Sequence, residues 1–128
     1  DNIERFELEG NSIASHVAVN GSSDVVKMAQ NDSRFNALAD DPGWVAGEEL
    51  HVIAVPCFAK DQMARMEFGA PKGVILASNS IDKGIFSQED LCNLESYAAV
   101  VGEVLECVET VENFYALREI YSHMGDSL

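Results

Sequence analysis

The last third of the chain carries one helical pattern, and this feature restricts the fold most. Apolar residues recur there in steps of three and four, so they line one face of a helix about five turns long. They are Leu91, Leu94, Ala98, Val101, Leu105 and Val108. Ser87 offers a hydroxyl N-cap, and Asp90 places a carboxylate three residues later, as in a capping box. The pattern predicts a long C-terminal helix that starts near Ser87 and packs one face on a sheet.

A second apolar stripe follows on a shifted face of the same helix. Its members are Val111, Phe114, Tyr115, Ile120 and Tyr121. The polar side carries a run of acidic residues, which is typical of a face turned to solvent. These are Glu95, Glu103, Glu106, Glu109 and Glu112. Two stripes on different faces indicate two separate roles. We expect the first stripe to pack on the sheet. The second would reach an adjoining domain of the parent protein or form a homodimer with a second copy.

The rest of the chain combines strand and helix patterns. Two apolar runs, residues 51–58 and 73–78, predict two buried neighbouring strands. Residues 13–18 have apolar positions at helical spacing and precede an Asn-Gly turn, which predicts a short helix. Residues 3–8 suit a strand that faces a core on one side. This order of elements predicts an α+β fold with an antiparallel sheet and a long C-terminal helix.

Composition narrows the class of partners. The chain has 128 residues, of which 47% are apolar, and this suits one packed domain. We assign residues 1–110 to that domain and residues 111–128 to a connecting helix that leaves it. With 22 acidic and 8 scattered basic residues, the net charge is −14. Such a chain repels DNA and anionic membranes, so we exclude nucleic acid as a partner. No apolar run approaches the roughly 18 residues of a membrane-spanning helix, so we expect no membrane insertion.

No catalytic or metal-binding pattern is found in the sequence. The three cysteines, Cys57, Cys92 and Cys107, are odd in number and lack short spacing. This is typical of reduced thiols in a cytoplasmic protein, not of a disulfide framework or a zinc site. Glycine-rich phosphate loops, nucleophile elbows and His-Glu-x-x-His motifs are all missing. We therefore predict that the chain is not an enzyme and holds no metal or resident cofactor.

Several stretches in succession resemble GAF domains, in particular the tandem GAF domains of cyclic-nucleotide phosphodiesterases. Residues 11–18 with Asn20 and Gly21 are similar to the family's "GIAGxVAxTG" helix. Residues 31–36 and 40–44 are similar to its "DPRFN…D…TGY" stretch, and residues 51–56 and 73–79 to its "ILCxP" and "GVxxxxN" strands. The resemblance implies a central antiparallel sheet with helices on both faces and a small-ligand pocket. It also places the family's leading helix and first one or two strands before Asp1.

The resemblance extends to a signature of the GAF domains that bind cyclic nucleotides. Asn79, Phe86 and Asp90 stand in register with its Asn, Phe and Asp, whereas Ser80 replaces its Lys and Leu91 its final Glu. In the family, the Lys–Asp pair is thought to brace the loop under the pocket. Ser80 cannot form this pair, although Lys83 offers a substitute within the loop. Because an exposed ion pair contributes only about 0–1 kcal/mol, we expect the fold to tolerate its loss.

The resemblance also implies ligand-binding residues. Backbone N–H groups near Ile13 and Ala14 would meet the phosphate of cyclic GMP or cyclic AMP at the positive end of their helix. Phe35 and Trp44 would enclose the purine, and Asp40 would hold a lid or read a base edge. Two other interpretations stay open: Trp44 would anchor the core, and Asp40 with Asp41 would cap a helix.

The function that this resemblance implies is regulatory. The chain would be the sensor domain of an intracellular signalling protein, with a cyclic nucleotide as its allosteric ligand and a homodimer as its assembled form. The alternative is a degenerate GAF fold that serves only protein–protein contact and dimerisation.

Overall fold

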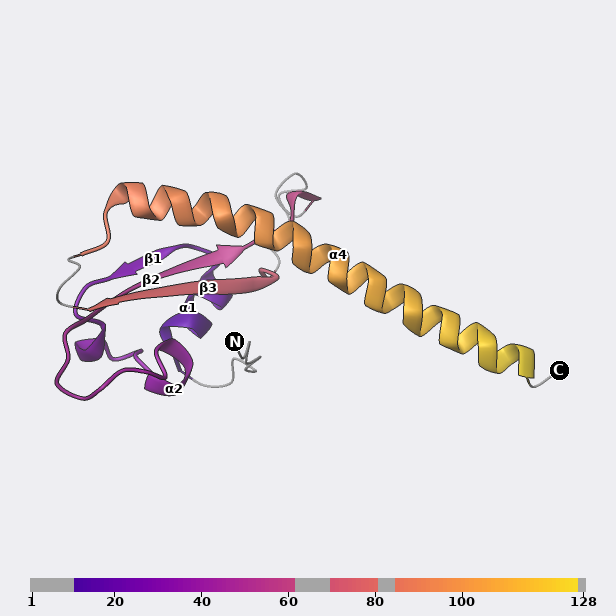
Figure 1. Cartoon of the computed structure of the whole chain (residues 1–128), viewed down its shortest axis with the longest axis horizontal. Coiled ribbons are helices and arrows are strands. Elements are labelled where there is room, and N and C mark those ends of the chain that lie inside the picture. The colour runs from indigo at the N-terminus through magenta and orange to yellow at the C-terminus, as the bar shows by residue number, and fades with distance from the viewer. Residues whose placement is uncertain (1–10, 62–69, 81–84, 127–128) are drawn as a thin grey trace.

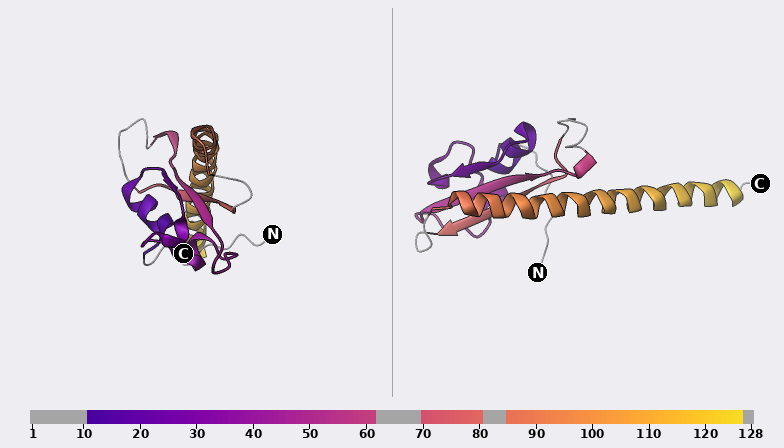
Figure 2. Two further views of the ribbon diagram at one scale, coloured as in Figure 1. Left: turned by 90° about the vertical axis from the view of Figure 1, so that its left-hand side faces the viewer. Right: turned by 90° about the horizontal axis from the view of Figure 1, so that it is seen from above.

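A three-stranded antiparallel sheet lies between two helical layers in the computed structural model, which describes residues 11–61, 70–80 and 85–126 (Figures 1 and 2). Its strands are β1 (Asp24–Val26), β2 (Leu50–Cys57) and β3 (Gly73–Ser80), in the order β1-β2-β3. The helices are α1 (Ile13–Asn20), η1 (Ala29–Asn31), α2 (Ala37–Asp40) and α4 (Gln88–Asp126). The α+β class, the antiparallel sheet and the long C-terminal helix are thus confirmed. The strand expected at residues 3–8, and Lys83, lie outside the described residues.

The central strand β2 is buried on both faces, and its side chains alternate between two cores. Leu50, Val52 and Ala54 pack toward α1, in a cluster with Ile13 and Val17 that we call the α1-side core. Residues on the other face pack toward α4, in a cluster that we call the α4-side core. Its buried members are Ile53, Val55, Cys57 and Ala98. A strand covered on both faces reads as a continuous apolar run, which is why the sequence pattern identified it.

Pro56 is accommodated because β2 is longer than its neighbour β1. The three residues of β1 pair with Val52, Ile53 and Ala54 only. Beyond Ala54, β2 has no described partner on that side, whereas β3 pairs with it along its whole length. A proline lacks an N–H and is therefore tolerated at such an open edge.

Helix α1 has well-defined ends. At its start, the Ser12 hydroxyl accepts a hydrogen bond from the Ser15 N–H, and the Ser15 hydroxyl accepts one from the Ser12 N–H. At its end, Gly21 adopts φ 68°, a left-handed conformation that glycine takes without strain. A Cβ at Gly21 would also approach the Phe58 ring to 3.3 Å. The chain therefore turns sharply toward β1.

Helix α4 has 39 residues and is about 58 Å long. Its first half packs on the sheet, and its second half projects far beyond it (Figure 1). Near the end of the sheet, the Glu103 carboxylate accepts a hydrogen bond from the Lys60 N–H, and Lys72 Nζ forms a 2.7 Å ion pair with Glu109 Oε2. These contacts fix the point at which the helix leaves the body of the domain. Among the described residues, no helix has the length and apolar character needed to cross a bilayer.

Candidate functional site

The buried Asp40 carboxylate lies at the N-terminus of α1. Asp40 Oδ2 accepts hydrogen bonds from the Ile13 N–H at 3.0 Å and the Asn36 N–H at 2.9 Å, and Oδ1 accepts one from the Ala14 N–H at 3.0 Å. Asp40 itself is only 5% exposed. The short helix α2 presents it, and α2 is in turn capped by the Asn36 side chain, which accepts from the Leu38 N–H.

This carboxylate occupies the donors that the resemblance assigned to a phosphate. The N–H groups of Ile13 and Ala14 already bond to Asp40, which also supplies the negative charge favoured at a helix N-terminus. A phosphate could reach these donors only by displacing a buried carboxylate. Asp41, in contrast, accepts a hydrogen bond only locally, from the Gly43 N–H.

Phe35 and Trp44 pack on each other edge to face. Their ring centroids are 5.3 Å apart at an interplanar angle of 81°. Both rings are half-buried against the α1-side core, together with Val74 and Leu76. Trp44 Nε1 donates to the Glu48 carbonyl at 3.1 Å, which satisfies its polar atom within the same loop. Much of both aromatic surfaces is therefore used in packing.

Two residues of the GAF signature, Phe86 and Asp90, lie on the opposite side of the sheet, with α4. Phe86 is half-buried against the α4-side core, and Asp90 forms a reciprocal cap with Ser87 at the start of α4. The Ser87 N–H donates to Asp90 Oδ2 at 2.7 Å and lowers the pKa of that carboxyl group. Phe86 and Asp90 help to line a pocket of about 280 Å³. Asn79 belongs to β3, opposite His51 of β2. Phe86 and Asp90 are thus separated by the sheet from the predicted ligand-binding residues on the α1 side.

An ion-pair network that the sequence analysis did not single out fixes the loop between η1 and α2. The Arg34 guanidinium donates to both carboxylate oxygens of Asp32, at 3.0 and 2.9 Å, and to Asp24 Oδ2 of β1 at 2.8 Å. The Arg34 guanidinium lowers the pKa of Asp32 to about 2, and the two carboxylates raise the pKa of Arg34. The Asp-x-Arg spacing was visible in the sequence, but the Asp24 partner depends on the fold.

This network predicts a specific loss of stability in acid. The folded-state pKa of Asp32 lies below its ordinary value of 3.8, so its contribution is complete above pH 4 and disappears as the pH falls toward 2. Because the side chains are partly exposed, we expect this contribution to be about 1–2 kcal/mol. Urea unfolding of the wild type and Arg34→Gln should show a stability gap at pH 6 that narrows between pH 4 and pH 2.5. A gap that stays constant over this range would contradict the assignment.

The one buried histidine among the described residues has a structural contact. His51 is 5% exposed, and its Nδ1 accepts a hydrogen bond from the Met28 N–H at 3.1 Å. Met28 adopts φ 51°, a left-handed conformation that is unusual for a residue with a side chain. The described part of the chain contains no cluster of three or more His, Cys, Asp or Glu side chains that could hold a metal ion.

A row of exposed apolar side chains follows α4 on a face away from the sheet, roughly a third of a turn from its packed face. We call it the outer stripe, and all its members are exposed. They are Tyr97, Val100, Val104, Cys107, Val111 and Phe114. Val104 is 55% and Phe114 62% exposed, which is high for apolar side chains that share one continuous row.

The chain matches no protein-family model, and a search of the curated proteins finds no match.

Proposed function

We propose that the chain is a GAF-type regulatory domain that acts through protein–protein contact and forms a homodimer through α4. The outer stripe is the single observation that carries this proposal. Its residues recur in steps of three, four, three, four and three, which is the a/d pattern of a coiled-coil seam. The seam starts beside the sheet at Tyr97 and continues into the projecting half, so a dimer would join both the bodies and the exit helices.

The distribution of charge on α4 supports the same partner. The helix carries many acidic residues, yet all six positions of the outer stripe are uncharged. Val108 and Tyr115, which follow the stripe along one edge, are also apolar and exposed. A second copy would thus bury apolar side chains only. No carboxylate would be buried, and the free-energy cost of burying an unpaired charge would be avoided.

The outer stripe is also large enough to form a dimer interface. Its large apolar members are 52–63% exposed, and Val108 and Tyr115 are 39% and 59% exposed. Pairing two copies along it would bury roughly 1,000–1,500 Å² in total, which approaches the area of a stable specific interface. The occupied N-terminus of α1 favours this contact-only form of the proposal over cyclic-nucleotide sensing, since Asp40 already binds the donors that a phosphate needs.

A glutamate placed in the stripe should separate the copies. We expect the wild-type chain to sediment as a dimer, and Val104→Glu to raise the dimer dissociation constant at least 100-fold, because each interface would then bury two carboxylates. Val19→Glu is the matched control, since Val19 is 84% exposed on α1, and it should leave the dimer intact. Added salt should strengthen the dimer, because each copy has a net charge of −14.

Three results would contradict this proposal. The first is a wild-type chain that remains monomeric at high concentration, and the second is a Val104→Glu variant that dimerises as well as Val19→Glu. The third is a thermal-shift titration in which cyclic GMP or cyclic AMP stabilises the chain, since this would favour ligand sensing instead. A ligand at 100 times its Kd stabilises a protein by about 2.7 kcal/mol, so binding would be easily detected.

A further inference from the structure

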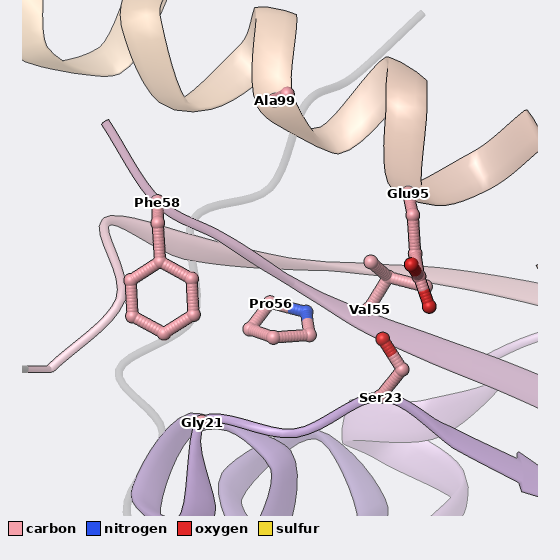
Figure 3. Close-up of a pocket in the computed structure, with 7 residues that line it drawn as sticks. All are labelled: Gly21, Ser23, Val55, Pro56, Phe58, Glu95 and Ala99. Carbon is pink, nitrogen blue, oxygen red and sulfur yellow. The ribbon is translucent and has the colours of Figure 1, made fainter. Parts of the chain in front are cut away.

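A pocket of about 210 Å³ lies where β2 extends past the end of β1 (Figure 3). Val55 and Pro56 of β2 form its floor, the loop after α1 forms one wall, and α4 forms the other. This pocket shares no lining residue with the predicted ligand-binding site or with the GAF signature. The lining residues are Gly21, Ser23, Val55, Pro56, Phe58, Glu95 and Ala99.

The polar groups of the pocket lie at one end. The Glu95 carboxylate reaches down from α4, and the Ser23 hydroxyl points up toward it from the loop before β1 (Figure 3). Among the described side chains, no Lys or Arg forms an ion pair with Glu95, in contrast to Glu109, which pairs with Lys72. A carboxylate beside a hydroxyl offers acceptors and a negative charge, a combination that suits a group with several N–H donors.

The other end of the pocket is apolar. Phe58 stands there with Pro56 between it and Glu95, and the exposed Ala99 borders the space from α4 (Figure 3). A second pocket of about 470 Å³ adjoins this end, since Gly21 and Phe58 line both. The C-terminal end of α1 borders that second space and has no basic residue in its last turn, so its negative dipole end is not neutralised.

We infer that this pocket binds a small primary ammonium ion with an apolar body. The ammonium group would donate to Glu95 and Ser23, while the apolar body would cover Pro56 and contact the Phe58 ring. Several features favour a cation over an anion: the Glu95 carboxylate, the C-terminal end of α1 and the net charge of −14. An exposed ion pair alone contributes little, so the apolar walls have to supply a large part of the affinity.

Benzylammonium is a suitable probe, because it carries the charge and a ring of the right size. We expect it to bind in the millimolar range at 0.15 M salt, with amide chemical-shift changes in ¹H–¹⁵N spectra centred on residues 21–23, Phe58 and Glu95. Benzyl alcohol, which shares its ring but not its charge, should bind roughly threefold more weakly, as expected for the loss of an exposed ion pair, and benzoate should bind more weakly still. Glu95→Gln should weaken benzylammonium binding roughly threefold, whereas Glu112→Gln, an exposed change elsewhere on α4, should leave it unchanged.

Three outcomes would overturn the inference. Benzyl alcohol could bind as tightly as benzylammonium, which would make the pocket merely apolar. Glu95→Gln could bind benzylammonium like the wild type, which would remove the carboxylate from the site. The shift changes could also spread over the whole acidic surface, which would indicate non-specific attraction of the cation. Folding of Glu95→Gln is checked in the same spectra, because Glu95 is exposed and the other amides should keep their positions.

Discussion

Replacing Gly102 by alanine should lower the free energy of unfolding by about 3 kcal/mol, although alanine is the better helix former. Gly102 is buried where α4 crosses the end of β2. A Cβ there would lie 2.6 Å from the Phe58 carbonyl carbon and 3.1 Å from the Phe58 nitrogen, and closer still to the carbonyl oxygen. These are backbone atoms, so no side-chain rotation can relieve the overlap. The helix itself would have to move away from the sheet.

Denaturant unfolding followed by far-UV circular dichroism measures this effect. Ala99→Gly is the matched control, because Ala99 is exposed on the same helix three residues earlier. It should cost about 1 kcal/mol from helix propensity alone. The two substitutions run in opposite directions on the propensity scale, so propensity cannot explain a loss in both. A Gly102→Ala variant at least as stable as the wild type would show that α4 does not approach Phe58 this closely.

The elements with local signals were predictable from the sequence. The start of α4 follows from the Ser87–Asp90 cap and the apolar spacing after it, both of which depend on neighbours within one or two turns. The strands β2 and β3 follow from their apolar runs. The close approach of Gly102 to the Phe58 backbone had no such local signal, since a glycine within a helical pattern indicates only a lower helix propensity at that position. Its role depends on Phe58, which is distant in the sequence.

The extent of the outer stripe could not be predicted for a different reason. Apolar spacing assigned the surface stripe to residues from Val111 onward and assigned Val108 to the sheet-facing side. In the structure, the exposed row already begins at Tyr97, and Val108 is 39% exposed. The first half of α4 is apolar on two faces, and periodicity alone does not reveal which face the sheet covers. Only the position at which α4 crosses β2 decides this.

The contacts of the candidate ligand-binding residues could not be predicted from the sequence either. The spacing of Ile13, Ala14 and Asp40 in the sequence gives no indication that the carboxylate bonds to the two N–H groups, since the partners are 26 and 27 residues apart. The resemblance implies that the N–H groups of Ile13 and Ala14 bind a phosphate. In the fold, the same N–H groups donate to the Asp40 carboxylate. Whether a helix N-terminus binds an outside anion or a side chain of its own domain is a tertiary property.

Asp40→Ala should therefore also be strongly destabilising, and we expect it to lower the free energy of unfolding by about 3 kcal/mol. It would remove both oxygens at once and leave the N–H groups of Ile13, Ala14 and Asn36 without their acceptor. Ile13 and Ala14 are almost completely buried, at 0% and 2% exposure, so water cannot easily replace the carboxylate. The measurement is again denaturant unfolding at neutral pH.

Asp41→Ala is the matched control, because it removes the same group from the next residue. Asp41 accepts one exposed hydrogen bond from the Gly43 N–H, so its loss should cost no more than about 0.5–1 kcal/mol. Asp40→Asn separates charge from shape: it keeps one acceptor but turns an NH₂ group toward N–H donors, and it should fall between the two alanine variants. If Asp40→Ala and Asp41→Ala proved equally mild, the Asp40 cap would not support α1, and its N–H groups would be open to an outside anion after all.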